Sequence, residues 1–312
     1  MRDSAPSARL RRPRLLIIGC GDIGLRVARL LRGRARLLAL TTSAGRCAEL
    51  RAAGIVPLVG DLDRGPTLAR LAGLADAVLH LAPPAGQGAA DGRTARLLQA
   101  LAQRGQVRRM VYASTSGVYG DAGGALIDET RRVDPATARA RRRVDAERRV
   151  RRFGRTAGAR VTLLRIPGIY GLDRAGGDPR ERVLRGAPVL RAEEDVYTNH
   201  IQADDLARAC IAALWRGPAQ RAINVCDDTA FKMGDYFDFV AALAGLEAPP
   251  RVSRAQAQAM LSPMQLSFMG ESRRLVNARM KRELRLKLRY PTVREGLAAL
   301  AAPAPRSAPA EG

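Results

Sequence analysis

The stretch that decides the fold of this chain reads Leu15-Leu16-Ile17-Ile18-Gly19-Cys20-Gly21-Asp22-Ile23-Gly24. Its four apolar residues are typical of a short buried strand, and its three glycines follow in the spacing Gly-x-Gly-x-x-Gly. The positions i, i+4, i+7 and i+8 of the next segment are apolar, which places them on one helix face: Ile23, Val27, Leu30 and Leu31. The stretch therefore predicts a strand, a tight turn and an amphipathic helix.

A glycine loop between a strand and a helix is typical of a site that binds a dinucleotide. Gly19 would make the tight turn, Gly21 would let the backbone approach a pyrophosphate, and Gly24 would let helix and strand pack closely. Free N–H groups at the start of the helix would meet the phosphates, so Asp22 and Ile23 join the predicted cofactor-binding residues. A plain strand-to-helix turn is the alternative, and the flanking strand and helix favour the binding loop.

Short apolar runs alternate with helical patterns along the first half of the chain. This alternation predicts an α/β fold, a Rossmann-type doubly wound parallel sheet with a smaller C-terminal substrate lobe. The expected strands are Leu15–Ile18, Leu37–Leu40, Ile55–Val59, Ala77–Leu81, Met110–Ala113 and Val161–Ile166. The expected organisation is a flexible tail at 1–13, a dinucleotide-binding domain at 14–170, a substrate lobe at 171–300 interleaved with the last strands, and a disordered tail at 301–312.

The charge of the chain is strongly positive, with 53 Lys+Arg against 30 Asp+Glu. All but three of these cations are arginines, and they are scattered along the chain rather than gathered between aromatic residues. We therefore expect a basic, solvated surface and no nucleic-acid partner. No apolar run is long enough for a membrane span, and the four cysteines contain no Cys-x-x-Cys pair, which favours a cytoplasmic protein without a metal site.

The end of the second expected strand indicates which dinucleotide binds. A carboxylate there would accept the ribose 2′-hydroxyl of NAD, but the sequence reads Thr41-Thr42-Ser43, with Arg46 beyond. Hydroxyls and a cation suit a 2′-phosphate, so we predict NADP(H) over NAD(H). The alternative is that Arg46 faces solvent on the following helix.

Several segments together resemble the extended short-chain dehydrogenase/reductase superfamily, and within it divergent members of the NAD-dependent epimerase/dehydratase group. The resemblance covers about residues 14 to 300. Besides the glycine loop, it is carried by Gly60-Asp61-Leu62, His80-Leu81-Ala82, Tyr112-Ala113-Ser114-Thr115-Ser116-Gly117-Val118-Tyr119-Gly120, Arg165-Ile166-Pro167-Gly168-Ile169-Tyr170-Gly171 and His200-Ile201-Gln202-Ala203-Asp204-Asp205-Leu206-Ala207.

The resemblance implies roles for five residues. Asp61 and Leu62 would flank the adenine, and Leu81 with Ala82 would pass beneath the ribose and nicotinamide. Thr115 would hold a substrate oxygen, although a threonine at a strand end can also simply cap a turn. We expect His80 and His200 to be structural.

The sequence departs from the family at its proton donor. Active members place a Tyr four residues before a Lys on one helix, and alignment on Asp145-Ala146-Glu147 puts Arg139 and Arg143 at these positions. An arginine stays protonated, so it can donate hydrogen bonds to an oxyanion but cannot act as a general acid or base. Arg143 can still hold the ribose as the lysine would. We keep Thr115, Arg139 and Arg143 as the candidate catalytic residues.

The helix expected at about 138–153 carries a dense cluster of arginines. We interpret it as a charged face paired with Asp145 and Glu147, and binding of an anionic substrate is the alternative. A second basic segment alternates with Leu284, Leu286 and Leu288, which indicates a partly buried strand or an irregular segment.

Three functions fit these features. The first is an NADP(H)-dependent oxidoreductase or epimerase that acts on a small molecule. The second is a catalytically inactive NADP(H)-binding regulator, which the missing Tyr and Lys favour. The third, suggested by charge alone, is a nucleic-acid-binding protein on the same scaffold. The sequence is compatible with a homodimer.

Overall fold

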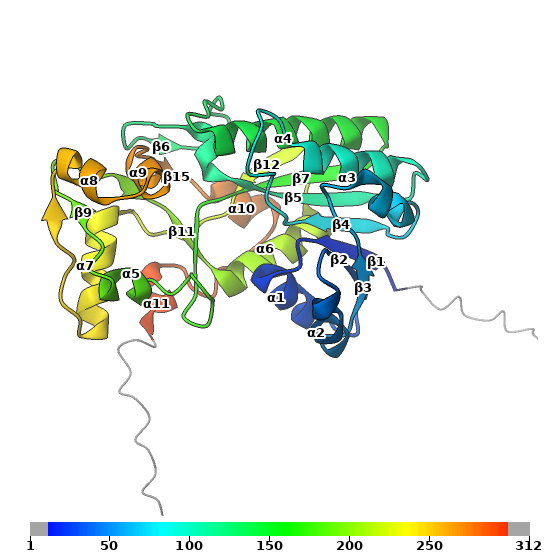
Figure 1. The fold of residues 1–312 in the computed structure, drawn as a ribbon, viewed down its shortest axis with the longest axis horizontal. Coiled ribbons are helices and arrows are strands. Elements are labelled where there is room, and N and C mark those ends of the chain that lie inside the picture. The colour runs from blue at the N-terminus through cyan, green and yellow to red at the C-terminus, as the bar shows by residue number, and fades with distance from the viewer. Residues whose placement is uncertain (1–11, 299–312) are drawn as a thin grey trace, which may run out of the picture.

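A parallel seven-stranded sheet forms the centre of the computed structural model, which describes residues 12–298 (Figure 1). Its strands are β1 (Arg14–Ile18), β2 (Arg36–Thr41), β3 (Ile55–Val59), β4 (Ala77–His80), β5 (Arg109–Thr115), β7 (Arg160–Ile166) and β12 (Arg221–Asn224). The order across the sheet is β3-β2-β1-β4-β5-β7-β12. The order reverses between β1 and β4, as in doubly wound dinucleotide-binding folds, so the predicted fold class is confirmed.

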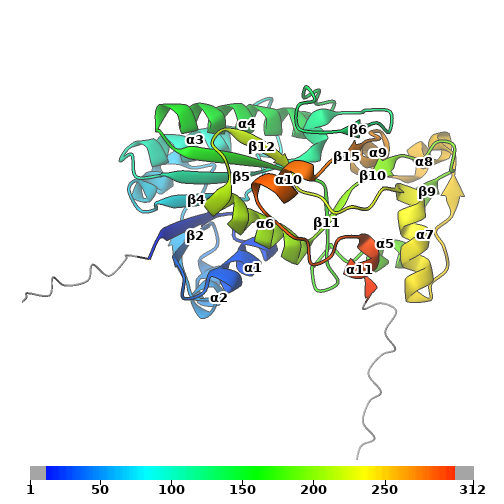
Figure 2. The same cartoon turned by 180° about the vertical axis from the view of Figure 1, so that it is seen from behind.

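Helices cover both faces of this sheet (Figures 1 and 2). One face packs against α1 (Asp22–Leu31) and α6 (Ala203–Arg216), and the other against α3 (Gly92–Ala102) and α4 (Ala138–Thr156). Alternate residues of β1 divide between the two cores: Leu15 and Ile17 lie with α1 and α6, whereas Leu16 and Ile18 lie with α3 and α4. A strand buried on both faces has no polar side, which explains why its sequence is continuously apolar.

Three short elements complete the edge of the sheet nearest β3: α2 (Cys47–Ala52) and the 3-10 turns η1 (Ala44–Arg46) and η2 (Gly65–Leu71). A third 3-10 turn, η3 (Ser116–Tyr119), follows β5 directly.

Short strand pairs and small helices form a second region beside the sheet (Figure 1). The pairs are β6 (Leu126–Ile127) with β15 (Arg274–Leu275), β8 (Gly168–Tyr170) with β11 (His200–Gln202), β9 (Val189–Leu190) with β14 (Arg251–Val252), and β10 (Tyr197–Thr198) with β13 (Phe231–Lys232). The helices are α5 (Arg180–Leu184), α7 (Met233–Ala244), α8 (Arg254–Met260), α9 (Pro263–Met269), α10 (Ala278–Glu283) and α11 (Val293–Gly296). Both α6 and β12 come from this half of the sequence but belong to the sheet and its cover.

The segment after α10 has no regular structure. Leu284, Leu286 and Leu288 are all buried, and the charged residues between them point outward. The prediction of a partly buried irregular segment is therefore confirmed. The predicted tails lie outside the described residues, apart from residues 12 and 13.

The described residues contain neither a candidate membrane-spanning helix nor a cluster of metal ligands. No helix within 12–298 combines the length and apolarity needed to cross a membrane. In the same residues no three His, Cys, Asp or Glu side chains are arranged to hold a metal ion, and the four cysteines are free thiols.

Candidate active site

The glycine loop makes a tight turn between β1 and α1. Gly19 has a φ of +82°, and a Cβ there would lie 2.5 Å from the amide nitrogen of Ala82, so the position accepts only glycine. A Cβ on Gly21 would meet no heavy atom within 4 Å, so the space in front of it is open. A Cβ on Gly24 would lie 3.1 Å from the sulfur of Cys20, which keeps helix and loop in close contact.

The start of α1 offers free donors to a ligand. No side chain caps this helix terminus, and the first N–H groups of a helix, here at Asp22, Ile23 and Gly24, have no partner within it. Donors at an open helix start bind phosphate. A pyrophosphate therefore fits the loop at the point where Gly21 leaves room for it.

Arg46 lies against this loop rather than in open solvent. Its Nη1 donates a hydrogen bond to the main-chain oxygen of Cys20 at 2.9 Å, and its other nitrogens bond both carboxylate oxygens of Glu49. Thr41 is buried and its hydroxyl bonds the main chain of Ser43, whereas Thr42 is exposed. Of the three residues predicted to favour NADP(H), Arg46 and Thr42 therefore have groups accessible to a ligand, and the hydroxyl of Thr41 shapes the turn.

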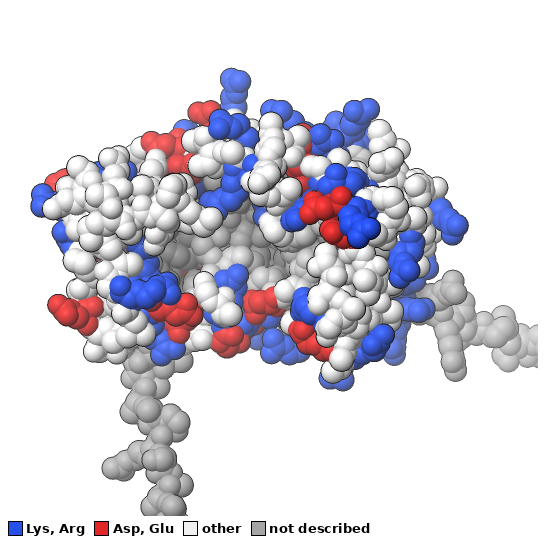
Figure 3. Space-filling view, in the orientation of Figure 1, with Lys and Arg blue, Asp and Glu red and all other residues white. Residues whose placement is uncertain are grey.

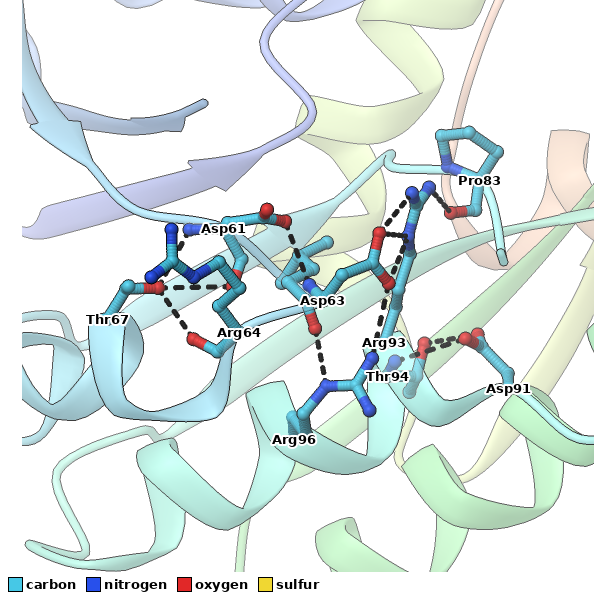
Figure 4. Close-up of polar contacts among 10 residues, drawn as sticks. Asp61, Asp63, Arg64, Thr67, Pro83, Asp91, Arg93, Thr94 and Arg96 are labelled. Carbon is cyan, nitrogen blue, oxygen red and sulfur yellow. Dashed lines mark hydrogen bonds and ion pairs between the residues drawn. The ribbon is translucent and has the colours of Figure 1, made fainter. Parts of the chain in front are cut away.

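The loop after β3 is held in a fixed shape by α3 (Figure 4). The N–H of Asp63 donates to Oδ1 of Asp61 at 2.8 Å, so the second oxygen of Asp61 remains free. Arg93 pairs with Asp63 at 2.5 Å, and Arg96 donates to the main-chain oxygen of Leu62 at 2.6 Å. Two arginines of α3 thus brace the segment that the resemblance assigns to the adenine.

The end of β4 lies directly beside the glycine loop. The N–H groups of Leu81 and Ala82 both donate to the oxygen of Ile18, at 2.8 and 3.0 Å. This contact brings together two predicted parts of the cofactor site that are about sixty residues apart in the sequence.

Thr115 ends β5 and caps the turn that follows. Its hydroxyl oxygen accepts the N–H of Gly117 at 3.2 Å, so its own proton remains available to a ligand. The side chain also lines a cavity of about 880 Å³. The capping role expected as an alternative is therefore present, and it leaves the hydroxyl on the cavity wall.

Arg139 and Arg143 line the same cavity as Thr115. The guanidinium carbon of Arg139 lies 4.8 Å from the ring centre of Phe268, in α9. Nη1 of Arg143 donates to the oxygen of Ala113 at 2.6 Å and to the hydroxyl of Tyr112 at 3.1 Å. Helical spacing puts residues i and i+4 on one face, and here that face opens into the cavity.

The cavity lies between the sheet and the second region. Figure 3 shows the front of the molecule hollowed between the part with α7–α9 and the part with α1 and α3. One wall comes from the loop after β8, where Arg174 lies 3.2 Å from Asp22 at the start of α1. The cavity wall therefore reaches the first residue of the helix that would bind the cofactor.

The sequence did not indicate the far wall of this cavity. Tyr236, Phe268 and Arg273 belong to it, but they carry no motif and only the packing of the second region brings them to Thr115. Their distance along the chain from β5 leaves no local signal that could have found them.

The interpretation of the α4 charges was half wrong. Asp145 pairs with Arg149 on the same helix, at 2.7 Å, as expected. Glu147 instead turns inward, where it accepts from Ser114 at 2.6 Å and pairs with Arg165 of β7 at 2.9 Å. Glu147 faces the sheet because it lies on the buried stripe of the helix, which charge spacing alone does not reveal.

Both histidines are buried. His80 bonds the hydroxyl of Thr94 at 2.9 Å. His200 stacks on Tyr236 with ring centres 4.0 Å apart, lines the cavity, and its Nδ1 has no hydrogen-bond partner among the described residues. Burial lowers the pKa of each imidazole to about 3, so both rings are neutral at physiological pH.

Residues 15–226 match the model of the NAD dependent epimerase/dehydratase family. The chain belongs to this family. The resemblance predicted from the sequence is confirmed, and with it an NAD(P)-binding protein of the epimerase/dehydratase type.

Solved structures share the family fold. A functionally unknown conserved protein from Silicibacter pomeroyi is 30% identical, with a TM-score of 0.78, and the match covers 92% of this chain and 98% of that one. The DesIV dTDP-glucose 4,6-dehydratase of Streptomyces venezuelae, solved with NAD bound, is 21% identical, with a TM-score of 0.74 over 92% and 95% of the chains. The UDP-glucose 4-epimerase of Thermotoga maritima is 20% identical, with a TM-score of 0.75 over 92% and 97%. No curated protein matches the chain.

Proposed function

We propose that this family member is an NADP(H)-dependent oxidoreductase or epimerase that acts on a small molecule. One observation carries the proposal: a cavity of about 880 Å³ opens at Thr115, Arg139 and Arg143. The carboxyl ends of parallel strands meet at one edge of a sheet, and ligands of such folds bind there. A substrate in this cavity would therefore lie beside a cofactor held by the glycine loop after β1.

The bound cofactor would supply hydride transfer at C4 of its nicotinamide ring. Thr115 would donate a hydrogen bond from its hydroxyl to the substrate oxygen. Arg139 and Arg143 would stabilise negative charge on that oxygen, but neither exchanges a proton. Water in the cavity would then supply the proton that a tyrosine gives in other family members, and turnover would be slower, by about a hundredfold to ten-thousandfold.

The preference for NADP(H) rests on Arg46. Its guanidinium lies at the glycine loop, at the end of β2, where the adenosine ribose of a bound dinucleotide would lie. An arginine at this place favours a ribose that carries a 2′-phosphate.

A regulator that binds NADP(H) without turnover is the second candidate. The two arginines at the positions of Tyr and Lys favour it, because they remove the usual proton transfer. The cavity at Thr115 favours the enzyme, since a regulator needs no substrate site there.

Calorimetric titration with NADPH, NADP, NADH and NAD, followed by nicotinamide absorbance with a panel of carbonyl and alcohol substrates, tests the proposal. We expect binding that Gly21→Asp abolishes, because the added carboxylate fills the open space and repels the pyrophosphate. Since a Cβ at Gly21 meets nothing, the variant should melt close to the wild type. Absence of binding to all four dinucleotides would refute the proposal.

Thr115 gives the test of turnover. Thr115→Val removes the hydroxyl at nearly constant volume and should lower kcat by about a hundredfold, whereas Thr115→Ser should retain most of it. Tight cofactor binding with no turnover of any substrate would favour the regulator instead.

A further inference from the structure

The cavity that contains Thr115 carries more positive than negative charge. Its lining includes six arginines and three carboxylates. Three of the arginines have carboxylate partners: Arg174 with Asp22 at 3.2 Å, Arg185 with Glu181 at 3.7 Å, and Arg273 with Glu271 at 2.6 Å. The third carboxylate of the lining, Asp178, pairs with Arg180 at 2.5 Å, outside it.

The other three arginines of the lining form no ion pair with any described carboxylate: Arg182 donates to the main-chain oxygen of Pro188 at 2.8 Å, and Arg139 and Arg143 lie one turn apart on α4. Arg139 contacts the ring of Phe268, and Arg143 uses one nitrogen on the oxygen of Ala113. Partial burial, and then the charge of Arg143, lower the pKa of Arg139 from its usual value. Arg139 and Arg143 are therefore two neighbouring cations of the cavity wall that no carboxylate within residues 12–298 neutralises.

Arg143 is half-buried and Arg139 is the more exposed of the two, so the cost in free energy that an anionic ligand would offset falls mainly on Arg143. Charges withdrawn from water are stabilised when they are paired and hydrogen-bonded. A guanidinium presents its N–H groups in a plane that matches the two oxygens of a carboxylate or phosphate. Arg143 keeps three of its five N–H groups free of described acceptors, because the two N–H groups of Nη1 face the hydroxyl of Tyr112 and the oxygen of Ala113.

We propose that the cavity binds its substrate through an anionic group, a carboxylate or a phosphate, which lies between Arg139 and Arg143. The position of Thr115 in the same cavity places this group near the reacting carbon. The substrate class is then a small carbonyl or hydroxyl compound with an acidic group close to the carbon that is oxidised or reduced. This assignment rests on the proposed function, but the anion site itself can be tested by binding alone.

The test is calorimetric titration of the full chain with malonate and, separately, with inorganic phosphate, at fixed ionic strength. Each titration is made on the protein alone and on protein saturated with NADPH. The variants are Arg139→Gln and Arg143→Gln, with Arg141→Gln as the matched control. Arg141 belongs to the same helix and its loss removes the same charge, but it does not line the cavity.

We expect one saturable site for at least one of the two anions. Arg139→Gln and Arg143→Gln should each weaken it about tenfold to a hundredfold, because a charge-assisted hydrogen bond is lost. Arg141→Gln should leave the affinity within about twofold. Binding of malonate but not phosphate would assign a carboxylate, and the reverse a phosphate.

Three results would overturn the inference. Neither anion binds saturably, or Arg141→Gln weakens binding as much as the cavity variants, or saturation with NADPH displaces the anion. The last result would show that the anion occupies part of the cofactor site, either at the glycine loop or at Arg143, where the ribose would lie.

The two proposals can fail separately. If anion binding depended on Arg139 and Arg143 but the protein reduced or oxidised no substrate, the anion site would be supported and the proposed enzyme activity refuted. If the protein turned over uncharged substrates and bound neither anion, the proposed enzyme activity would be supported and the anion site refuted.

Discussion

The guanidinium of Arg46 donates a hydrogen bond to the main-chain oxygen of Cys20 at 2.9 Å, which joins the turn after β2 to the glycine loop after β1. Glu49 holds the other side of the same guanidinium with both carboxylate oxygens. The cation of Arg46 is therefore held at the glycine loop, and the carboxylate of Glu49 partly neutralises it.

This relationship predicts how cofactor preference can be changed. Arg46→Gln should weaken the binding of NADPH by about tenfold to a hundredfold, because the 2′-phosphate loses a charged donor. The affinity for NADH should change little. Glu49→Gln should strengthen the binding of NADPH, since Arg46 then no longer pairs with a carboxylate. Calorimetric titration of both variants with the two dinucleotides measures this. If Arg46→Gln weakened the binding of NADPH and NADH equally, Arg46 would stabilise the glycine loop and would not contact the 2′-phosphate.

The buried pair of Glu147 and Arg165 predicts a large effect on stability. Glu147→Gln leaves the arginine charged and unpaired below the sheet surface, so the free energy of unfolding should fall by about 3–5 kcal/mol. The double variant Glu147→Leu, Arg165→Met should recover much of this loss, because no charge remains buried.

Urea unfolding measures these differences, and Arg149→Gln is the control. This substitution breaks the partly exposed pair with Asp145 and should cost at most about 1 kcal/mol. A loss as large as that of Glu147→Gln would mean that α4 as a whole, and not the buried pair, sets the stability.

Asp227 predicts a dependence of stability on pH. Its Oδ2 is buried and has no hydrogen-bond partner in the described part of the chain, and burial is the main cause that raises its pKa from 3.8 to about 7. Between these two values the folded state keeps a proton that the unfolded state loses. The contribution of Asp227 to stability therefore falls as the pH rises from about 4 to 7, by up to about 4 kcal/mol, and is constant above.

Asp227→Asn should remove this dependence, because the amide is neutral at every pH and its oxygen can still accept the N–H of Thr229. Urea unfolding of both proteins at several pH values gives the difference directly. The free energy of unfolding of the variant should rise relative to that of the wild type as the pH rises. A difference between the two that stays constant would contradict the raised pKa of Asp227.

The sheet could be predicted because its signals are local. Each strand is a short apolar run followed by a helical pattern, and the six expected strands all lie in the central sheet. The seventh strand of the sheet, β12, is only four residues long, and the topology alone shows that it pairs with β7.

The cofactor loop and the positions of Arg139 and Arg143 were also readable, since each depends on spacing within a single turn or helix. Sequence alone determined that Gly19, Gly21 and Gly24 end a strand and begin a helix, and that two arginines share a face of α4. These features follow from the periods of the strand and helix, which neighbours in the sequence set.

Only the tertiary structure decided what these residues face. It placed Glu147 on Arg165, Arg46 on the glycine loop and Arg174 on Asp22, through contacts between segments far apart in the chain. It also brought Phe268 of α9 onto Arg139 and so closed the cavity around Thr115. Such contacts depend on how separate elements pack, and no local periodicity specifies the partner that a side chain meets across a core or a cavity.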